Sequence, residues 1–228
     1  MTFEELQTTI GVTFRSQELL KQAFVHRSYL NEAKDIRTSN ERLEFLGDAI
    51  LSFLTSEYLY QTYPDSPEGM LTNIRSSLVK TTSLSTIAQS LHLGDLLFLS
   101  HGEEASGGRT NQSLLADVFE ALLGALYLDQ GIEVCREYLT KHLFSRTKDI
   151  VENKAYVDYK SLLQELIQQS SRLSPTYVVV KSEGPDHART FWVEARSNAT
   201  VLGAGQGKSK QEAEQQAALQ ALEKMGKI

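Results

Sequence analysis

Residues 39–54 read SNERLEFLGDAILSFL, and this stretch decides the fold of the larger part of the chain. Its apolar residues recur at helical spacing, so we expect a helix over residues 40–62. Glu41, Glu44 and Asp48 are spaced i, i+3 and i+7, which at about 100° per residue places them on one helical face. Like charges so placed repel each other, and carboxylates held beside core-forming residues favour a bound cation.

Residues 111–131, NQSLLADVFEALLGALYLDQG, repeat this pattern. Asp117 and Glu120 are three residues apart in a helix so apolar that we expect it at the centre of its domain. No Lys or Arg lies between Arg109 and Arg136 to neutralise them. If the two acidic faces meet, their oxygens suit Mg²⁺ or Mn²⁺ and the phosphoryl chemistry that such ions serve. From the residues alone, an ordinary solvated helix face is the alternative.

The other parts of residues 1–150 also carry apolar residues at helical spacing, with Gly and Pro mainly at the breaks. Thr38 precedes Glu41 by three residues, which fits a capping box, so we expect Thr38 to cap the following helix. Gly131 suits the position just after a helix. The further helices are expected at 3–9, 16–25, 68–79, 82–91, 111–130 and 132–150, with loops at 62–69 and 101–111.

The periodicity changes near Asp158, which is a good N-cap for an amphipathic helix. Three runs rich in β-branched and aromatic residues follow, and then a closing segment rich in helix formers. We therefore expect a mainly α protein. Its parts are an all-α domain over residues 1–150, a linker over 151–157, and a small α+β domain of α-β-β-β-α order over 158–228.

Charge is divided unevenly between these parts. Residues 1–154 carry a net charge of −7 and residues 155–228 a net charge of +1, which indicates different tasks. The total of −6 alone argues against a nucleic-acid partner. However, Lys208 and Lys210 flank Ser209 at the expected start of the closing helix, and helix N-termini favour phosphate groups.

The composition excludes several classes of protein. With 228 residues, 41% hydrophobic and 23% charged, the chain is an ordinary globular sequence rather than a disordered or fibrous one. Its single cysteine, Cys135, rules out a disulfide-stapled secreted domain. No apolar stretch approaches the roughly 18 to 20 residues that cross a bilayer, and no signal-peptide pattern is visible. We therefore expect a cytoplasmic protein without a membrane partner.

Several blocks of the sequence resemble bacterial ribonuclease III, in the same order and over nearly the whole chain. NERLEFLGD at residues 40–48 looks like the signature segment of that family, and the same holds for HRSY at 26–29 and PEGMLTNIRSSLV at 67–79. SGGRTNQSLLADVFEALLGALYLDQG at 106–131 is a further block. Residues 158–226 resemble a double-stranded-RNA-binding domain through DYKSLLQE, GPDH and GKSKQEAEQQAA.

This resemblance implies a role for individual residues. The carboxylates that it marks as metal-binding and catalytic are Glu44, Asp48, Asp117 and Glu120. A further active-site acid is Glu41, and the residues expected beside the cleft are Glu68 and Arg109. The residues expected to contact RNA are Gln164, Glu165, His187, Lys208, Ser209 and Lys210. The family often has Lys where this chain has Gln211, which implies one phosphate contact fewer.

The resemblance also implies a function. We expect a homodimeric endoribonuclease that cuts double-stranded RNA by Mg²⁺-activated attack of water, with Mn²⁺ able to substitute and no small-molecule cofactor. Products would carry 5′ phosphates and 3′ hydroxyls with short 3′ overhangs, as in the processing of ribosomal and messenger precursors. The alternatives are a non-catalytic double-stranded-RNA-binding protein with a decayed nuclease domain, and an all-α phosphohydrolase acting on small nucleotides.

Overall fold

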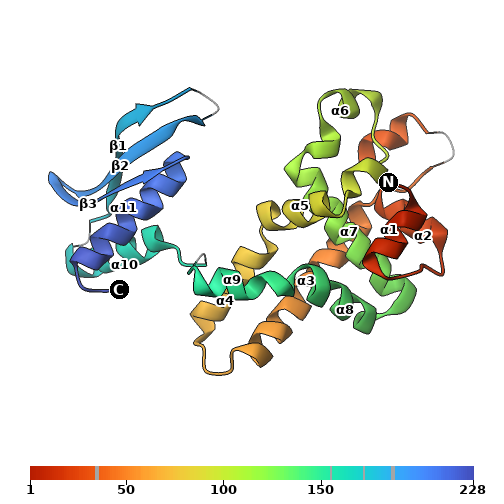
Figure 1. Ribbon diagram of the computed structural model, residues 1–228, viewed down its shortest axis with the longest axis horizontal. Helices are drawn as coiled ribbons and strands as arrows, with labels where there is room; N and C mark the ends of the chain where they lie inside the picture. Colours follow the sequence, from red (N-terminus) through yellow and green to blue (C-terminus); the bar gives the residue numbers. More distant parts are fainter. Residues whose placement is uncertain (34–35, 155, 172, 186–187) are drawn as a thin grey trace. The chain divides into compact units, whose positions relative to one another are not determined.

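The protein is described from a computed structural model, in residues 1–33, 36–154, 156–171, 173–185 and 188–228. The chain forms two compact units, Met1–Tyr156 and Val157–Ile228, drawn in Figure 1. The first unit is all-helical and the second combines helices with one sheet, so the expected mainly α fold class is confirmed. Among the described residues, no helix is both long enough and apolar enough to cross a bilayer.

The all-helical unit is built around α7 (Gln112–Gln130), in which ten residues are buried. Helices α2, α3, α5 and α8 all pack against it. This central position follows from the apolar sequence of α7, which leaves only short polar faces. The helices of this unit are α1 (Phe3–Ile10), α2 (Gln17–Ala23), α3 (Glu41–Thr62), α4 (Glu68–Val79), α5 (Thr81–Ser90), α6 (His101–Ala105), α7, α8 (Ile132–His142) and α9 (Thr147–Glu152).

Helix α3 begins differently from the prediction. Its N-cap is Asn40, and the expected Thr38 cap is wrong. The backbone N–H of Asn40 donates to the carbonyl of Val25 at 2.8 Å, and its side chain donates to the carbonyl of Ala23 at 3.3 Å. These tertiary bonds attach the start of α3 to the segment after α2, and they override the local capping pattern.

Three further stretches differ from the expectation. The loop expected at residues 101–111 contains α6, because the Ser100 hydroxyl accepts the backbone N–H of Glu103 and starts a helical turn there. The helix expected over 132–150 is interrupted after His142, where a short 3₁₀ turn separates α8 from α9. Helix α9 also covers the first residues of the stretch expected to be a linker.

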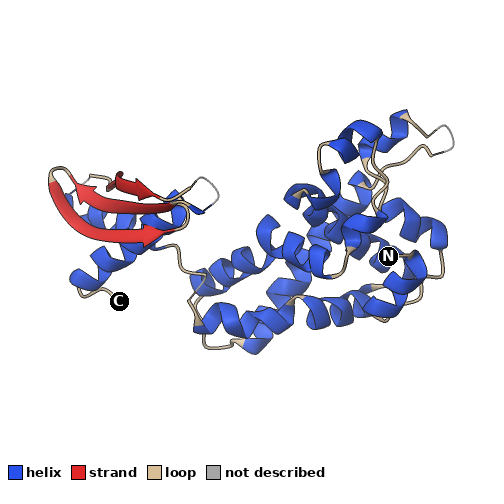
Figure 2. Cartoon of the chain, turned by 45° about the horizontal axis from the view of Figure 1, so that its top comes forward, coloured by secondary structure: helices blue, strands red, loops and turns tan. Residues whose placement is uncertain are grey.

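The second unit has the expected order of one helix, three strands and one helix. Its elements are α10 (Tyr159–Ser171), β1 (Thr176–Glu183), β2 (Thr190–Ser197), β3 (Thr200–Gly207) and α11 (Lys210–Lys224). The strands form an antiparallel sheet in the order β1-β2-β3, and both helices cover one face of it (Figure 2). The core between sheet and helices includes Leu163, Val193 and Leu222.

Candidate active site

Four carboxylates from two helices form the most unusual feature of the all-helical unit. We call Glu44, Asp48, Asp117 and Glu120 the acidic cluster. The first two lie on α3 and the others on α7. Two glycines let these helices cross in backbone contact, since a Cβ atom added to Gly47 would lie 2.6 Å from the carbonyl carbon of Glu120. A Cβ atom on Gly124 would lie 3.0 Å from the carbonyl carbon of Leu43.

The carboxylates act on one another across this crossing. Burial raises the pKa of Glu120 to about 8, and the negative charges of Asp48, Glu44 and Asp117 add to the rise. Burial, then Asp117, also raises the pKa of Glu44 above its ordinary value. Burial raises the pKa of Asp117 as well. The crossing therefore brings together the two acidic faces, and it leaves their charges partly uncompensated.

The chemistry of the acidic cluster fits a hard divalent cation, which takes carboxylate oxygens and relieves their repulsion. In the part of the chain that the structure describes, no group of three His, Cys, Asp or Glu side chains is already arranged to hold an ion. The cluster thus supplies the right donors without a preformed cage. Mg²⁺ suits such a site because it keeps several of its own waters and needs few protein ligands.

The three other acidic or cleft residues expected from the sequence differ in their surroundings. Glu41 lies at the edge of the cluster, where its carboxylate accepts from the Ser39 hydroxyl at 2.9 Å and pairs with Arg27 at 3.7 Å. Glu68 begins α4 and accepts from the Thr72 hydroxyl of its own helix at 2.9 Å. It does not contribute to the raised pKa of either Glu44 or Glu120.

Arg109 connects the turn before α7 to the segment at residues 94–97 through hydrogen bonds. Its Nη1 donates to the carbonyl oxygens of Gly94, Asp95 and Leu97 at 3.0 to 3.1 Å, and its Nε donates to Glu104 at 2.7 Å. These bonds hold the turn that precedes α7, so Arg109 positions the helix that carries half of the cluster. The sequence offered no signal for this role, because the carbonyl groups lie in another segment.

The expected RNA-contacting residues lie on the second unit. Gln164 and Glu165 are exposed on α10, and Lys208 and Lys210 are exposed at the start of α11. Ser209 caps α11 as predicted, with its hydroxyl accepting the backbone N–H of Glu212 at 3.1 Å. The first turn of α10 is bonded to α11, since the side-chain amide of Gln215 donates to Asp158 at 2.8 Å and Lys160 pairs with Glu214. His187 lies outside the described residues.

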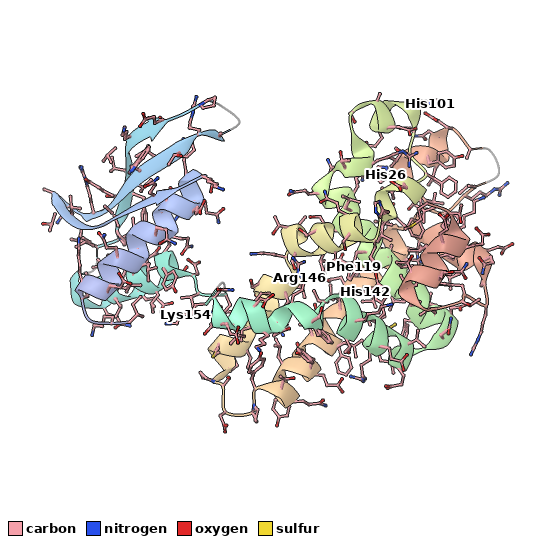
Figure 3. The ribbon with its side chains drawn as sticks, in the orientation of Figure 1. His26, His101, Phe119, His142, Arg146 and Lys154 are labelled. Atoms are coloured by element: carbon pink, nitrogen blue, oxygen red, sulfur yellow. The ribbon has the colours of Figure 1, made fainter. Side chains whose placement is uncertain are left out.

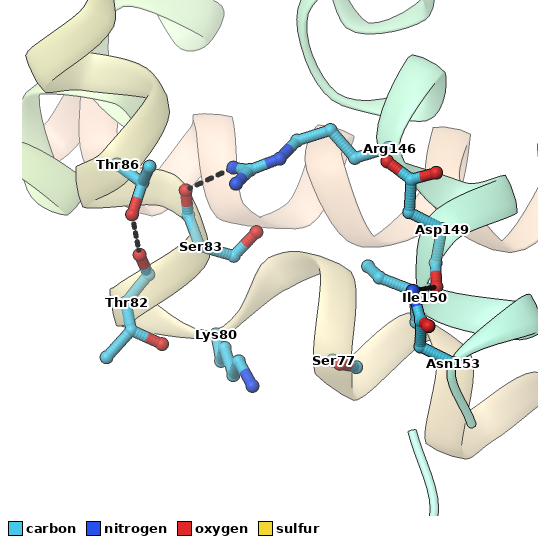
Figure 4. Close-up of a pocket in the computed structure, with 9 residues that line it drawn as sticks. All are labelled: Ser77, Lys80, Thr82, Ser83, Thr86, Arg146, Asp149, Ile150 and Asn153. Carbon is cyan, nitrogen blue, oxygen red and sulfur yellow. Dashed lines mark hydrogen bonds between the residues drawn. The ribbon is translucent and has the colours of Figure 1, made fainter. Parts of the chain in front are cut away.

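A separate hollow of about 430 Å³ lies beside the turn between α4 and α5 and against α9 (Figure 4). Its lining is polar and includes Lys80, Arg146 and Asp149, and the Arg146 guanidinium donates to the carbonyl of Ser83 at 3.4 Å. No member of the acidic cluster lines it. The hollow and the cluster are therefore distinct features of this unit.

Comparison with known proteins identifies both units. Residues 16–147 match the family described as Ribonuclease-III-like, and residues 159–225 match the double-stranded RNA binding motif. Ribonuclease 3 of Geobacillus kaustophilus is 46% identical over 97% of this chain and 90% of its own length. Ribonuclease 3 of Enterococcus faecalis is 46% identical over 96% of this chain and 95% of its own length.

A solved structure is also similar. The nuclease domain of Campylobacter jejuni ribonuclease III, which has a flexible region involved in dimer formation, is 36% identical and superposes with a TM-score of 0.59. The similarity covers 63% of this chain and 97% of that domain. The all-helical unit thus shares its fold with a nuclease domain.

Proposed function

Since this chain belongs to the ribonuclease III family, we propose that the acidic cluster is the active site of a double-strand-specific endoribonuclease. The observation that carries the proposal is the meeting of carboxylates from α3 and α7 at the Gly47–Gly124 crossing. The second unit, which matches the double-stranded RNA binding motif, accounts for the choice of substrate. Such domains read A-form shape, 2′-hydroxyls and phosphates over roughly 16 base pairs.

The proposed cofactor is Mg²⁺, with Mn²⁺ able to replace it, held by the acidic cluster. When bound, the ion lowers the pKa of water and neutralises charge on the phosphate. The half-buried side chains of Glu44, Asp117 and Glu120 orient the reacting groups, and without a cation the Glu120 carboxyl keeps its proton at neutral pH. In-line attack of water leaves a 5′ phosphate and a 3′ hydroxyl. Glu41, paired with Arg27, borders this site.

Residues of the second unit make the proposed contacts with RNA. Lys208 and Lys210 bind phosphate groups of the RNA. The N-terminus of α11, which Ser209 caps, adds the attraction of the positive end of the helix dipole. Gln164 and Glu165 on α10 face the minor groove, where 2′-hydroxyls accept and donate hydrogen bonds. His187 belongs to the proposal by family resemblance alone.

We further propose that the enzyme acts as a homodimer. Helix α3 carries three large apolar side chains that are exposed in the single chain: Phe45 (81% exposed), Phe53 (57%) and Tyr60 (75%). Such an exposed apolar face indicates an interface. A second copy on this face would bring two acidic clusters together, each cutting one strand, which explains short 3′ overhangs. A cytoplasmic location, where RNA precursors are processed, is part of the same proposal and is tested by cell fractionation.

The test is cleavage of a long, labelled RNA duplex. We expect the wild type to give short duplexes with Mg²⁺ and none with EDTA. Glu120→Gln should lower kcat by about 100-fold or more, on the scale of losing one preorganised electrostatic group, and should still retard the duplex on a gel. Glu137→Gln, at an exposed position on α8, is the matched control. Binding of duplex without any cleavage, even with Mn²⁺, would favour the non-catalytic alternative.

A further inference from the structure

Helices α10 and α11 pack against each other through a core of small side chains. Ala213, Ala217 and Ala218 of α11 are fully buried, and the buried side chains of α10 are Leu163 and Ile167. The two helices cover the same face of the sheet, and their side chains are drawn in Figure 3. Alanine methyl groups form a shallow surface without deep grooves, so this core fixes the distance between the helices better than their rotation.

A polar contact beside this core fixes the orientation of α10. The side-chain Nε2 of Gln215 donates to the carboxylate of Asp158 at 2.8 Å, and its Oε1 accepts the backbone N–H of Lys160 at 3.4 Å. Because a carboxylate only accepts and a backbone N–H only donates, these partners determine which end of the amide is which. One side chain of α11 therefore holds the first turn of α10 at two points.

The partners of Gln215 are themselves held in place. The Asp158 carboxylate accepts the backbone N–H and the hydroxyl of Ser161 at 3.2 and 2.8 Å, so it caps α10. Burial raises the pKa of Asp158, but hydrogen bonds from Gln215 and then from Ser161 outweigh it and lower that pKa below its ordinary value. Lys160 pairs with Glu214 in addition. We call Asp158, Lys160, Glu214 and Gln215 the α10–α11 clamp.

The α10–α11 clamp lies one helical turn from both sets of proposed RNA contacts. On α10, Gln164 follows Lys160 by four residues, and on α11, Glu214 follows Lys210 by four residues. Residues four apart in a helix are neighbours on one face. Gln164 and Lys210 are both exposed. A rotation of α10 at the clamp would therefore move Gln164 relative to Lys210.

We propose that Gln215 is a positioning residue for duplex RNA, which sets the separation between the RNA contacts of α10 and those of α11. An A-form duplex presents its minor groove and its phosphates at fixed spacings, so both sets of contacts form together only when the protein matches that spacing. A preorganised spacing also avoids the cost of ordering the helices during binding. The inference rests on the proposed function and deepens it, because it names the contact that adjusts the second unit to its substrate.

Three variants separate this role from a simple effect of charge. Gln215→Glu keeps an acceptor for the Lys160 N–H but places a second carboxylate against Asp158. Gln216→Glu is the matched control, because it adds the same charge at the neighbouring position, which is exposed. Adding Asp158→Asn to Gln215→Glu puts an amide donor opposite the new carboxylate. Since Asn caps a helix as well as Asp does, the double variant re-forms the contact in the reverse direction.

Duplex binding is measured by gel shift, and cleavage of the same duplex gives kcat and KM. The fluorescence of Trp192, the only tryptophan of the chain, follows the unfolding of the second unit. We expect Gln215→Glu to weaken binding and raise KM roughly 10- to 100-fold, as for loss of a hydrogen bond to a charged group. The kcat should stay within a few fold of the wild type, because the acidic cluster is unchanged. The double variant should recover most of the lost affinity.

Two results would overturn the proposal. One is a folded Gln215→Glu protein that binds duplex as tightly as the Gln216→Glu control. The other is a double variant that binds no better than Gln215→Glu. If Gln215→Glu does not fold, Gln215→Ala, which removes both hydrogen bonds without adding charge, takes its place in the comparison with the wild type. A wild type that binds no duplex RNA would instead refute the proposed function, and this inference with it.

Discussion

The crossing of α3 and α7 gives the sharpest prediction, which is that Gly47→Ala separates the two halves of the acidic cluster. A Cβ atom at Gly47 would lie 2.6 Å from the carbonyl carbon of Glu120 and 3.1 Å from the amide nitrogen of Gly124. Carbon atoms in contact normally lie about 3.5 to 4.0 Å apart. Both obstacles are backbone atoms, which have no alternative rotamer. The helices must therefore move apart by about 1 Å.

This displacement has two consequences of different size. Overpacking of a well-packed core costs about 1 to 3 kcal/mol, which the protein can survive. Moving a catalytic group by about 1 Å costs on the order of 100-fold in rate. The new contact falls on Glu120 itself, so the shift is transmitted directly to the distance between Glu120 and the α3 carboxylates. We therefore expect kcat to fall about 100-fold in a variant that is still folded.

The assay is single-turnover cleavage of duplex RNA over a range of Mg²⁺ concentrations, with thermal unfolding of the same samples. Gly102→Ala on α6 is the control, because an added Cβ atom there has nothing within 4 Å. The control should retain full activity. A folded Gly47→Ala protein with wild-type kcat and wild-type Mg²⁺ dependence would refute the reasoning, since the cluster would then tolerate separation of its helices.

Three further predictions concern other parts of the molecule. Replacing Lys208 and Lys210 by Gln should weaken duplex binding. It should also reduce the slope of the logarithm of the binding constant against the logarithm of salt concentration by about one for each phosphate that is no longer neutralised. Lys224→Gln should change neither quantity, and gel shifts over a salt series measure both. Phe45→Asp should shift the protein toward monomer in sedimentation, because this side chain is exposed in the single chain and would be covered in the proposed dimer; an unchanged dimer would contradict the interface. Burial, with a smaller effect of Lys141, lowers the pKa of His142 to about 4. The His142 ring therefore takes up a proton more readily in the unfolded chain than in the folded one. The contribution of the neutral ring to the free energy of unfolding is fully present above about pH 6.5 and is lost as the pH falls toward 4. Denaturant unfolding should show that acidification lowers the unfolding free energy of the wild type more than that of His142→Phe, and parallel curves would contradict this.

The elements of the fold were predictable where periodicity and local signals agree. The acidic face of α3, the apolar centre of α7 and the Ser209 cap of α11 all follow from residues close together in the sequence. The sequence-based predictions fail where contacts between residues far apart in the sequence determine the local structure. Asn40 replaces Thr38 as the cap of α3 because its partners, Ala23 and Val25, belong to an earlier segment.

The surroundings of the site were less predictable than its carboxylates. The position of the segment after α2 and the position of the turn before α7 each depend on hydrogen bonds between different segments of the chain. Ser100 donates to Ser28, 72 positions away, and Arg109 donates to a carbonyl 15 positions away. Periodicity identifies which face a residue occupies, but it contains no information about which loop lies opposite. The hydrogen-bond donors that surround an acidic site can therefore be identified only from the tertiary structure.

The uneven charge of the chain now has a physical explanation. Burial, with added repulsion from the neighbouring carboxylates, raises the pKa of Glu120 to about 8, so the acidic cluster is destabilising as long as no cation is bound. Adding basic residues around it would relieve this repulsion, but they would also compete with the cation that we propose for this site. The basic residues that we propose to attract RNA are instead on the second unit, where Lys208 and Lys210 are exposed. Separating attraction from cleavage in this way lets the first unit keep a net charge of −7.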